Sequence, residues 1–277
     1  MIRLTAPSRP GPAGIERKSA RELALMRQAG RINAEALAEM AAHAREGVTT
    51  GELDALAERV IVSHGAAPAF KGYPGPYPYP AATTISLNAE MVHGIPGPRA
   101  LRDGDLVSLD CGTLFQGYYA DSAVSVVVGT ASPLARRLLE VAEQALYAGI
   151  AAARPGNRTG DVAMTMQAFV EQHGIRMARL YTSHGIGRHM HEAPEIRYYV
   201  KRGTGVVLRP GMTLALEPMV LVGTPETEVL ADQWTVVSAD GSLTAHFEHT
   251  VAVTDGEPEV LTRGWQASPR HSTGGRV

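Results

Sequence analysis

The sequence contains one cysteine, little net charge and no long apolar run, and each shortage excludes a class of protein. The single Cys111 cannot form an internal disulfide, which agrees with a reducing compartment, and we interpret it as a small buried apolar residue. A net charge of -2 without a basic stretch gives no reason to expect nucleic acid or an anionic membrane as a partner. No apolar run approaches the ~18 residues of a membrane span, and the first residues lack the apolar core of a signal peptide. We therefore expect a cytoplasmic protein.

The sequence does have ample material for a core, since 44% of its 277 residues are hydrophobic. Prolines among glycine and serine predict a flexible arm over residues 1–15, and the polar end predicts a disordered tail over 263–277. The globular part would then span residues 16–262, which is long enough for one large domain or two small ones.

Helical signals come in two pairs. Apolar residues recur at helical spacing from Ser19 to about Ala44, and a second amphipathic stretch follows TTGE at 49–52, where threonine and glutamate have the spacing of a capping box. A third helix is predicted after the serine and proline at 132–133, a cap followed by a first-turn proline, and a fourth over about 160–173.

The pairs belong to an internal repeat. Residues 47–66 align with 156–175 at an offset of 109 (156 - 47), and 101–110 align with 208–217 at an offset of 107 (208 - 101). We predict an α+β fold in which a helix-helix-strand-strand unit is duplicated over about 20–128 and 132–253. The two units would pack about a pseudo-twofold axis, with a central antiparallel sheet and the helices outside. His64 and His173, before a glycine in each unit, are interpreted as end-of-helix residues.

Two aspartates occupy a predicted hairpin over residues 106–122. With the turn at either 115–116 or 116–117, Asp121 lies opposite Asp110 or opposite Gly112, so both carboxylates share one face. Like charges on neighbouring strands raise each other's pKa unless a shared proton, a cationic side chain or a metal ion compensates them. A solvated strand face is the simpler alternative.

The second unit offers partners for these carboxylates. Glu217, in register with Asp110, and Glu248 each interrupt an apolar segment that we expect to be a strand, where an unpaired charge is costly. Four histidines lie in two short segments: His93, His184, His189 and His191. Four carboxylates with imidazole make a hard, oxygen-rich site that suits Mn, Fe(II), Co or Mg and could bridge two ions, but suits structural zinc poorly.

From about Ile15 to Thr262 the sequence closely resembles the type I methionine aminopeptidases, which are metallopeptidases of family M24 with the pita-bread fold. The resemblance rests on NAEMVHGIPGPRALRDGDLVSLD, GYYADSA, SHGIGRHMHE, MTLALEPMV and HFEHTVAVT. It implies one catalytic domain that removes the initiator methionine from nascent polypeptides with a small second residue. The ligand intervals (217 - 184 = 33 and 248 - 217 = 31) agree with the bacterial form of that family.

The resemblance also implies roles for individual residues. Two divalent ions such as Co, Mn or Fe(II) would be held by Asp110, Asp121, His184, Glu217 and Glu248. In this scheme Asp121 and Glu248 bridge the ions and Glu217 handles a proton. His191 would donate to the scissile carbonyl group, and His93 would contact the amide nitrogen of the leaving side.

The methionine pocket is where this sequence departs from the family pattern. Trp234 and Tyr79 take familiar positions, but Met190 replaces an aromatic residue and Thr84 replaces a cysteine. Pro76, in the proline-rich loop over 72–80, falls where a second tyrosine would be. Met190 keeps apolar volume, so methionine specificity is expected to survive.

The implied partners are the N-termini of nascent polypeptides at the ribosome, and we expect a monomer. Two alternatives stay open on the sequence: a proline-specific exopeptidase of the same fold, and a pita-bread binding module without metal. The first would carry a large extra N-terminal domain, and the second would have lost ligands.

Overall fold

The computed structural model describes residues 14–264, so the predicted arm and tail lie almost wholly outside the described residues. Within that range four helices form at the places that the sequence predicts. They are α1 (Ala20–His43), α2 (Thr50–Ser63), α3 (Pro133–Ala152) and α4 (Thr159–Gln172).

The predicted helix starts are confirmed by their caps. The side chain of Thr49 accepts a hydrogen bond from the backbone N–H of Glu52, and the Glu52 carboxylate accepts one from the backbone N–H of Thr49. At the start of α3, the Ser132 side chain accepts from a backbone N–H and Pro133 stands in the first turn. These bonds satisfy N–H groups that have no partner inside a helix, which fixes where each helix begins.

The strands over residues 14–264 form one nine-stranded sheet and two three-stranded sheets, all antiparallel. The large sheet has the order β1-β4-β5-β14-β9-β7-β8, with β2 beside β4 and β15 beside β14. Its strands are β1 (Ala67–Pro68), β2 (Thr83–Leu87), β4 (Leu106–Phe115), β5 (Tyr118–Val127), β7 (Thr182–Gly185), β8 (Glu192–Arg197), β9 (Thr213–Leu216), β14 (Glu248–Ala252) and β15 (Glu259–Val260). The smaller sheets contain β13 (Thr244–His246), β10 (Met219–Leu221) and β6 (Arg176–Met177), and β11 (Thr227–Val229), β12 (Val236–Ser238) and β3 (Glu90–Val92).

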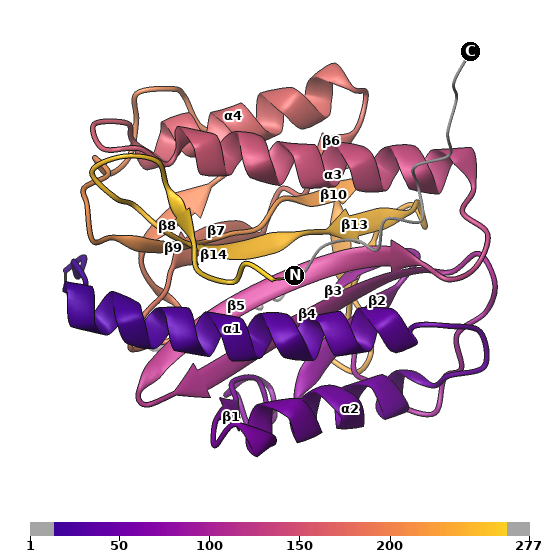
Figure 1. Cartoon of the computed structure of the whole chain (residues 1–277). Coiled ribbons are helices and arrows are strands. Elements are labelled where there is room, and N and C mark those ends of the chain that lie inside the picture. Colours follow the sequence, from indigo (N-terminus) through magenta and orange to yellow (C-terminus); the bar gives the residue numbers. More distant parts are fainter. Residues whose placement is uncertain (1–13, 265–277) are drawn as a thin grey trace, which may run out of the picture.

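The two halves of the chain meet inside the large sheet, where β5 pairs with β14. Helices α1 and α2 lie on one side of the strands in Figure 1, and α3 and α4 lie on the other. Helix α1 packs on β4 and β5, whereas α3 packs on β10, β13 and β14. The predicted α+β arrangement, with strands central and helices outside, is confirmed.

Equivalent contacts recur in the two halves at the offsets found in the sequence. The backbone N–H of Gly47 donates to the carbonyl of Leu101 at 2.9 Å, and that of Gly156 donates to the carbonyl of Leu208 at 3.2 Å. Helices α2 and α4 both end at the histidines that the sequence places there: His64 and His173. The two halves therefore repeat the same backbone contact just before their second helix.

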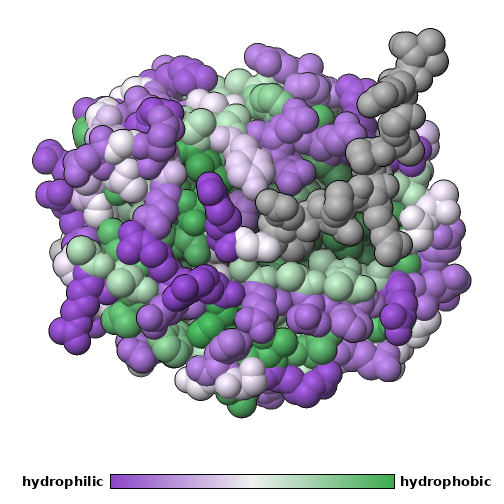
Figure 2. Space-filling view, in the orientation of Figure 1, coloured by the Kyte–Doolittle hydropathy of each residue, from purple (hydrophilic) through white to green (hydrophobic). Residues whose placement is uncertain are grey.

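On the face of the molecule drawn in Figure 2, hydrophilic and hydrophobic residues alternate in small groups. None of the helices within residues 14–264 combines the length and the apolar character that crossing a membrane requires.

Candidate metal centre and active site

Strand register brings three carboxylates onto one face of the large sheet. Asp110 on β4 lies opposite Ala123 on β5, and Ala123 lies opposite Glu248 on β14. Asp121 precedes Ala123 by two positions and therefore points to the same side. The tight turn is at 116–117, with positive φ angles of 48° and 82°, so the second of the two predicted registers, Asp121 opposite Gly112, is the one that forms.

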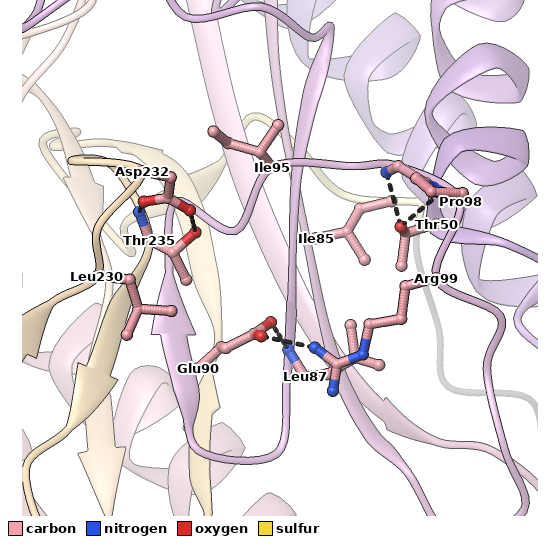
Figure 3. A pocket seen from close by; sticks show the side chains of 11 residues that line it. Thr50, Ile85, Leu87, Glu90, Ile95, Pro98, Arg99, Leu230, Asp232 and Thr235 are labelled. Carbon is pink, nitrogen blue, oxygen red and sulfur yellow. Dashed lines mark hydrogen bonds and ion pairs between the residues drawn. The ribbon is translucent and has the colours of Figure 1, made fainter.

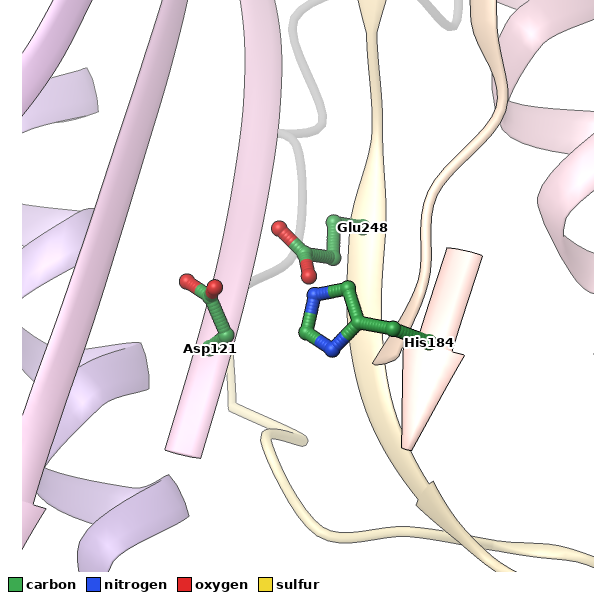
Figure 4. Close-up of side chains that lie close together, drawn as sticks. All are labelled: Asp121, His184 and Glu248. Carbon is green, nitrogen blue, oxygen red and sulfur yellow. The ribbon is translucent and has the colours of Figure 1, made fainter. Parts of the chain in front are cut away.

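The second half adds an imidazole and a fourth carboxylate to this face. His184 on β7 lies opposite Ala215 on β9, which lies opposite Thr250, two positions from Glu248. Figure 4 shows the side chains of His184, Glu248 and Asp121 gathered in one place, with an atom of each within 4.8 Å of the others. Glu217 was expected inside a strand, but β9 ends at Leu216 and Glu217 follows it. Its carboxylate still reaches the cluster, with Oε1 at 3.3 Å from Nε2 of His184.

Several polar atoms of the cluster have no hydrogen-bond partner within the described part of the chain, although they are buried. They are Oδ1 of Asp110, Oδ1 of Asp121, Oε1 of Glu248 and Nε2 of His246. Burial raises the pKa of Asp110 to about 6 and that of Glu217 to about 7. The pKa values of Asp121 and Glu248 are raised further, by burial first and then by the neighbouring carboxylates. Unpaired buried acceptors that repel one another are the arrangement that a bound cation stabilises.

The ring of His184 is oriented for ligation. Its Nδ1 lies 2.8 Å from the carbonyl oxygen of Gly185, so Nδ1–H donates there and Nε2 presents its lone pair to the cluster. Glu217 is held by its backbone, whose N–H donates to Ser183 Oγ at 2.9 Å and whose carbonyl accepts from the Tyr198 hydroxyl at 3.1 Å. The donor set thus fits divalent cations that prefer oxygen with some nitrogen, and its residues come from both halves of the sheet.

His246 is a member of this cluster that the sequence interpretation missed. Its Nε2 lies 3.6 Å from Oε2 of Glu217 and 3.9 Å from Oε2 of Glu248. The segment HFEH at 246–249 could have revealed it. Side chains alternate along a strand, so His246 lies on the same face as Glu248, which follows it by two positions.

His191 stands beside this centre. Its ring centroid lies 4.3 Å from that of His184, and its Nδ1 lies 2.7 Å from the hydroxyl of Tyr73. His191 is exposed to solvent at this end of the site, yet the protein packed around its ring and then His184 lower its pKa well below the usual range, so the ring is neutral. With the Tyr73 hydroxyl donating to Nδ1, we assign the ring proton to Nε2, where it is available as a donor.

His93 approaches from the first half. It has a positive φ of 61°, which a non-glycine residue adopts only when its surroundings impose it. Its ring packs edge-on near Tyr181 and Trp234, with centroids 6.2 Å and 6.4 Å away. Burial, and then the neighbouring His246, lower the pKa of His93 to about 4, so His93 is also neutral at pH 7.

The four predicted pocket residues occupy three different environments. The rings of Tyr79 and Trp234 are buried edge-to-face with centroids 5.1 Å apart, and the Tyr79 hydroxyl donates to the carbonyl of Gly94. Met190 is buried in a neighbouring apolar cluster against which Phe70 and Tyr73 pack. Thr84 lies instead against the candidate ligands, since its hydroxyl donates to Oδ2 of Asp110 at 3.2 Å.

The proline-rich loop brings Tyr73 to the site, although the sequence comparison expects the second tyrosine of the family at position 76. The backbone N–H of Gly72 donates to the carbonyl of Tyr79 at 2.8 Å, and that of Tyr79 donates to the carbonyl of Tyr73 at 3.0 Å. These bonds close a loop between Tyr73 and Tyr79, which includes Pro76. Tyr73 is the tyrosine whose hydroxyl reaches His191. The side chain of His189, the remaining histidine of that segment, is 52% exposed.

A separate open cavity is drawn in Figure 3. Its volume is about 400 Å³. It is lined by Thr50 and by residues from 85–99 and 230–235, and none of the candidate ligands is among them. Asp232, which lines it, accepts hydrogen bonds from the backbone N–H groups of Trp234 and Thr235, and these bonds fix the Trp234 loop.

Comparison with known proteins agrees with a buried, carboxylate-rich metal centre on a duplicated α+β fold. The profile of metallopeptidase family M24 matches residues 24–255. The chain therefore belongs to metallopeptidase family M24.

Within that family its near relatives share one activity. The chain is 46% identical over 246 residues to methionine aminopeptidase 1 of Bacillus subtilis, covering 89% of this chain and 98% of that protein. It superimposes on the crystal structure of methionine aminopeptidase from Thermotoga maritima with a TM-score of 0.88 and 41% identity, covering 91% of this chain and all of that one. These similarities place it among the methionine aminopeptidases, as its motifs predict. A prolidase from Pyrococcus furiosus, at 23% identity and a TM-score of 0.74, shares the fold alone, and 66% of that longer chain is covered.

Proposed function

We propose that this protein removes methionine from polypeptide N-termini by metal-dependent hydrolysis, and that Asp110, Asp121, His184, Glu217 and Glu248 hold two divalent ions. The observation that carries the proposal is the set of buried, unpartnered carboxylate oxygens converging where β5 meets β14. Four ionised carboxylates bring four negative charges into a buried site, which two divalent cations would neutralise. Co(II), Mn(II) and Fe(II) all suit such ligands, and availability in the cell would select among them.

When bound, the ions supply a Lewis acid and lower the pKa of water. The residues of the chain then divide the remaining work. Glu217, beside His184, accepts the proton of the attacking water through its carboxylate and passes it on. Nε2–H of His191 donates to the scissile carbonyl oxygen as negative charge develops there, and neutral His93 contacts the amide nitrogen of the leaving side.

The side chain of the substrate methionine would lie against the aromatic wall beside the centre. Tyr79 and Trp234 form that wall, with Phe70 and Tyr73 packed next to them. A thioether makes favourable contacts with aromatic rings, and Met190 keeps the neighbouring volume apolar. The substrates we propose are nascent polypeptides with a small second residue, processed in the cytoplasm at the ribosome by a monomer.

The test is release of methionine from the peptides Met-Ala-Ser and Met-Ile-Ser by metal-stripped protein, before and after addition of Co(II), Mn(II) or Fe(II). We expect cleavage of the alanine peptide only, and only with metal. Cleavage of Xaa-Pro peptides in its place would support a proline-specific exopeptidase. Tight metal binding without cleavage of any of these peptides would support a binding module.

A further inference from the structure

We propose that His246 is a further protein ligand of the metal centre, on the side formed by Glu217 and Glu248. The inference rests on the proposed metal centre and adds a second imidazole to it. Each of the three side chains offers one atom that lies within 4.8 Å of the other two. None of the roles assigned above uses His246.

The distances fit a shared cation better than a direct hydrogen bond. Nε2 of His246 lies 3.6 Å from Oε2 of Glu217 and 3.9 Å from Oε2 of Glu248, which is too long for hydrogen bonds. Nitrogen and oxygen ligands stand about 2.0–2.2 Å from a divalent ion such as zinc. Two ligand atoms on one ion are then roughly 3 to 4 Å apart, the range observed here.

His246 is buried, and its unpartnered Nε2 lies next to the carboxylates of Glu217 and Glu248. The side chain is 3% exposed, and Nε2 has no hydrogen-bond partner among residues 14–264. A buried nitrogen without a partner costs free energy. Carboxylate oxygens of Glu217 and Glu248 lie within 4.0 Å of this nitrogen, so a cation between them would satisfy all three groups at once.

The backbone of His246 is fixed from both sides. Its N–H donates to Ser125 Oγ at 2.9 Å, and Ser125 Oγ donates to its carbonyl oxygen at 2.9 Å. Ser108 Oγ lies 2.7 Å from Ser125 Oγ, and Met219 on β10 pairs with His246 across the small sheet. The ring therefore projects from a rigid strand end, which is how ligating side chains are pre-positioned.

A second imidazole has a chemical consequence for the centre. His184 faces Oε1 of Glu217 and His246 faces Oε2, so one carboxylate lies between two nitrogen donors. Imidazole favours Co, Zn and Ni over Mn and Mg, which prefer oxygen. We therefore expect the centre to prefer Co(II) and Zn(II) more strongly than it would in a His246→Gln variant, which offers an amide in place of the imidazole.

The experiment compares the full-length wild-type protein with His246→Gln and with His249→Gln as the matched control. His249 is buried on the opposite face of β14, and its Nδ1 lies 2.9 Å from Thr262 Oγ1, away from the cluster. Each metal-stripped protein is loaded with two equivalents of Co(II), and proton NMR counts the strongly shifted signals of exchangeable imidazole N–H groups. Calorimetry measures the affinities for Co(II) and Mn(II), and circular dichroism checks the fold.

We expect two shifted imidazole signals in the wild-type protein and in His249→Gln, and one in His246→Gln. His246→Gln should also bind Co(II) about 10–100-fold more weakly, with a smaller loss for Mn(II). Two bound Co(II) ions with a single imidazole signal in the wild-type protein would overturn the inference and leave the metal centre standing. A wild-type protein that binds no Co(II) would overturn both. The wild-type signal count decides even if His246→Gln fails to fold.

Discussion

The hydroxyl of Tyr73 lies 2.7 Å from Nδ1 of His191, and it joins the proline-rich loop to the histidine that we assign as a donor. The two rings also meet edge-on, with centroids 5.5 Å apart. This bond fixes the tautomer of His191 and the direction of its Nε2–H. The loop therefore positions the ring that we propose as the donor to the scissile carbonyl group.

Tyr73→Phe should lower kcat about tenfold with little change in KM, because it removes the bond that orients His191 but keeps the ring. Steady-state kinetics on Met-Ala-Ser measures both constants. Tyr199→Phe is the control, since the Tyr199 hydroxyl donates to the carbonyl of Met177 at 2.7 Å. Equal kcat values for Tyr73→Phe and wild type would contradict the positioning role.

Glu217→Gln should lower kcat by about 10²–10⁴-fold, because an amide cannot take up the proton. Single-turnover release of methionine at saturating Co(II) isolates the chemical step. Glu35→Gln on α1 is the control, since its side chain is 55% exposed, and its rate should match that of the wild-type protein. If Glu217→Gln bound both ions and kept more than a tenth of wild-type kcat, the proton role would be wrong.

Asp121→Asn should stabilise the metal-free protein, by about 1–2 kcal/mol, and remove most of its stabilisation by metal. The sign follows from burial and from the neighbouring carboxylates, which raise the pKa of Asp121 and make its charge unfavourable without a cation. Thermal unfolding with EDTA and with added Mn(II) measures both effects, since a ligand of the folded state raises Tm. A lower Tm for Asp121→Asn than for wild type in EDTA would refute this account of the cluster.

Gly75→Ala should impair methionine binding without unfolding the protein. A Cβ atom at Gly75 would lie 2.3 Å from the Trp234 ring, so the ring or the loop must shift. We expect kcat/KM for Met-Ala-Ser to fall about tenfold or more, with Tm changed by a few degrees at most. Gly97→Ala is the matched control, because its Cβ would meet nothing within 4 Å. Similar kcat/KM values for both variants would show that the Trp234 wall does not contact substrate.

Glu22→Gln should reduce stability in a pH-dependent way. The Tyr118 hydroxyl, at 2.6 Å, and then groups of Ser19 lower the pKa of Glu22 to about 2. Because this pKa is depressed in the folded state, the ionised carboxylate stabilises the fold above its ordinary pKa of 4.5, and this stability is lost as pH falls towards 2. Urea unfolding should give a deficit of about 1 kcal/mol at pH 7 that shrinks as the pH falls from about 4.5 towards 2. A deficit that stays constant over that range would exclude the ionic contribution.

Local patterns in the sequence were sufficient to predict where the helices begin and which residues form most of the candidate site. Caps such as Thr49 with Glu52 and Ser132 with Pro133 act within a few residues, so their outcome does not depend on distant parts of the chain. Carboxylates isolated in apolar segments, such as Asp121, identify the centre because an unpaired charge is costly there.

The tertiary structure alone decided the positions of residues whose contacts are distant along the chain. Tyr73 reaches His191 because hydrogen bonds between 72–73 and 79 close the loop, which counting at fixed intervals cannot detect. His246 joins the cluster because Ser125, 121 residues earlier, fixes its backbone. A sequence states which chemical groups are available, whereas the direction in which each points depends on pairing between strands that are distant along the chain.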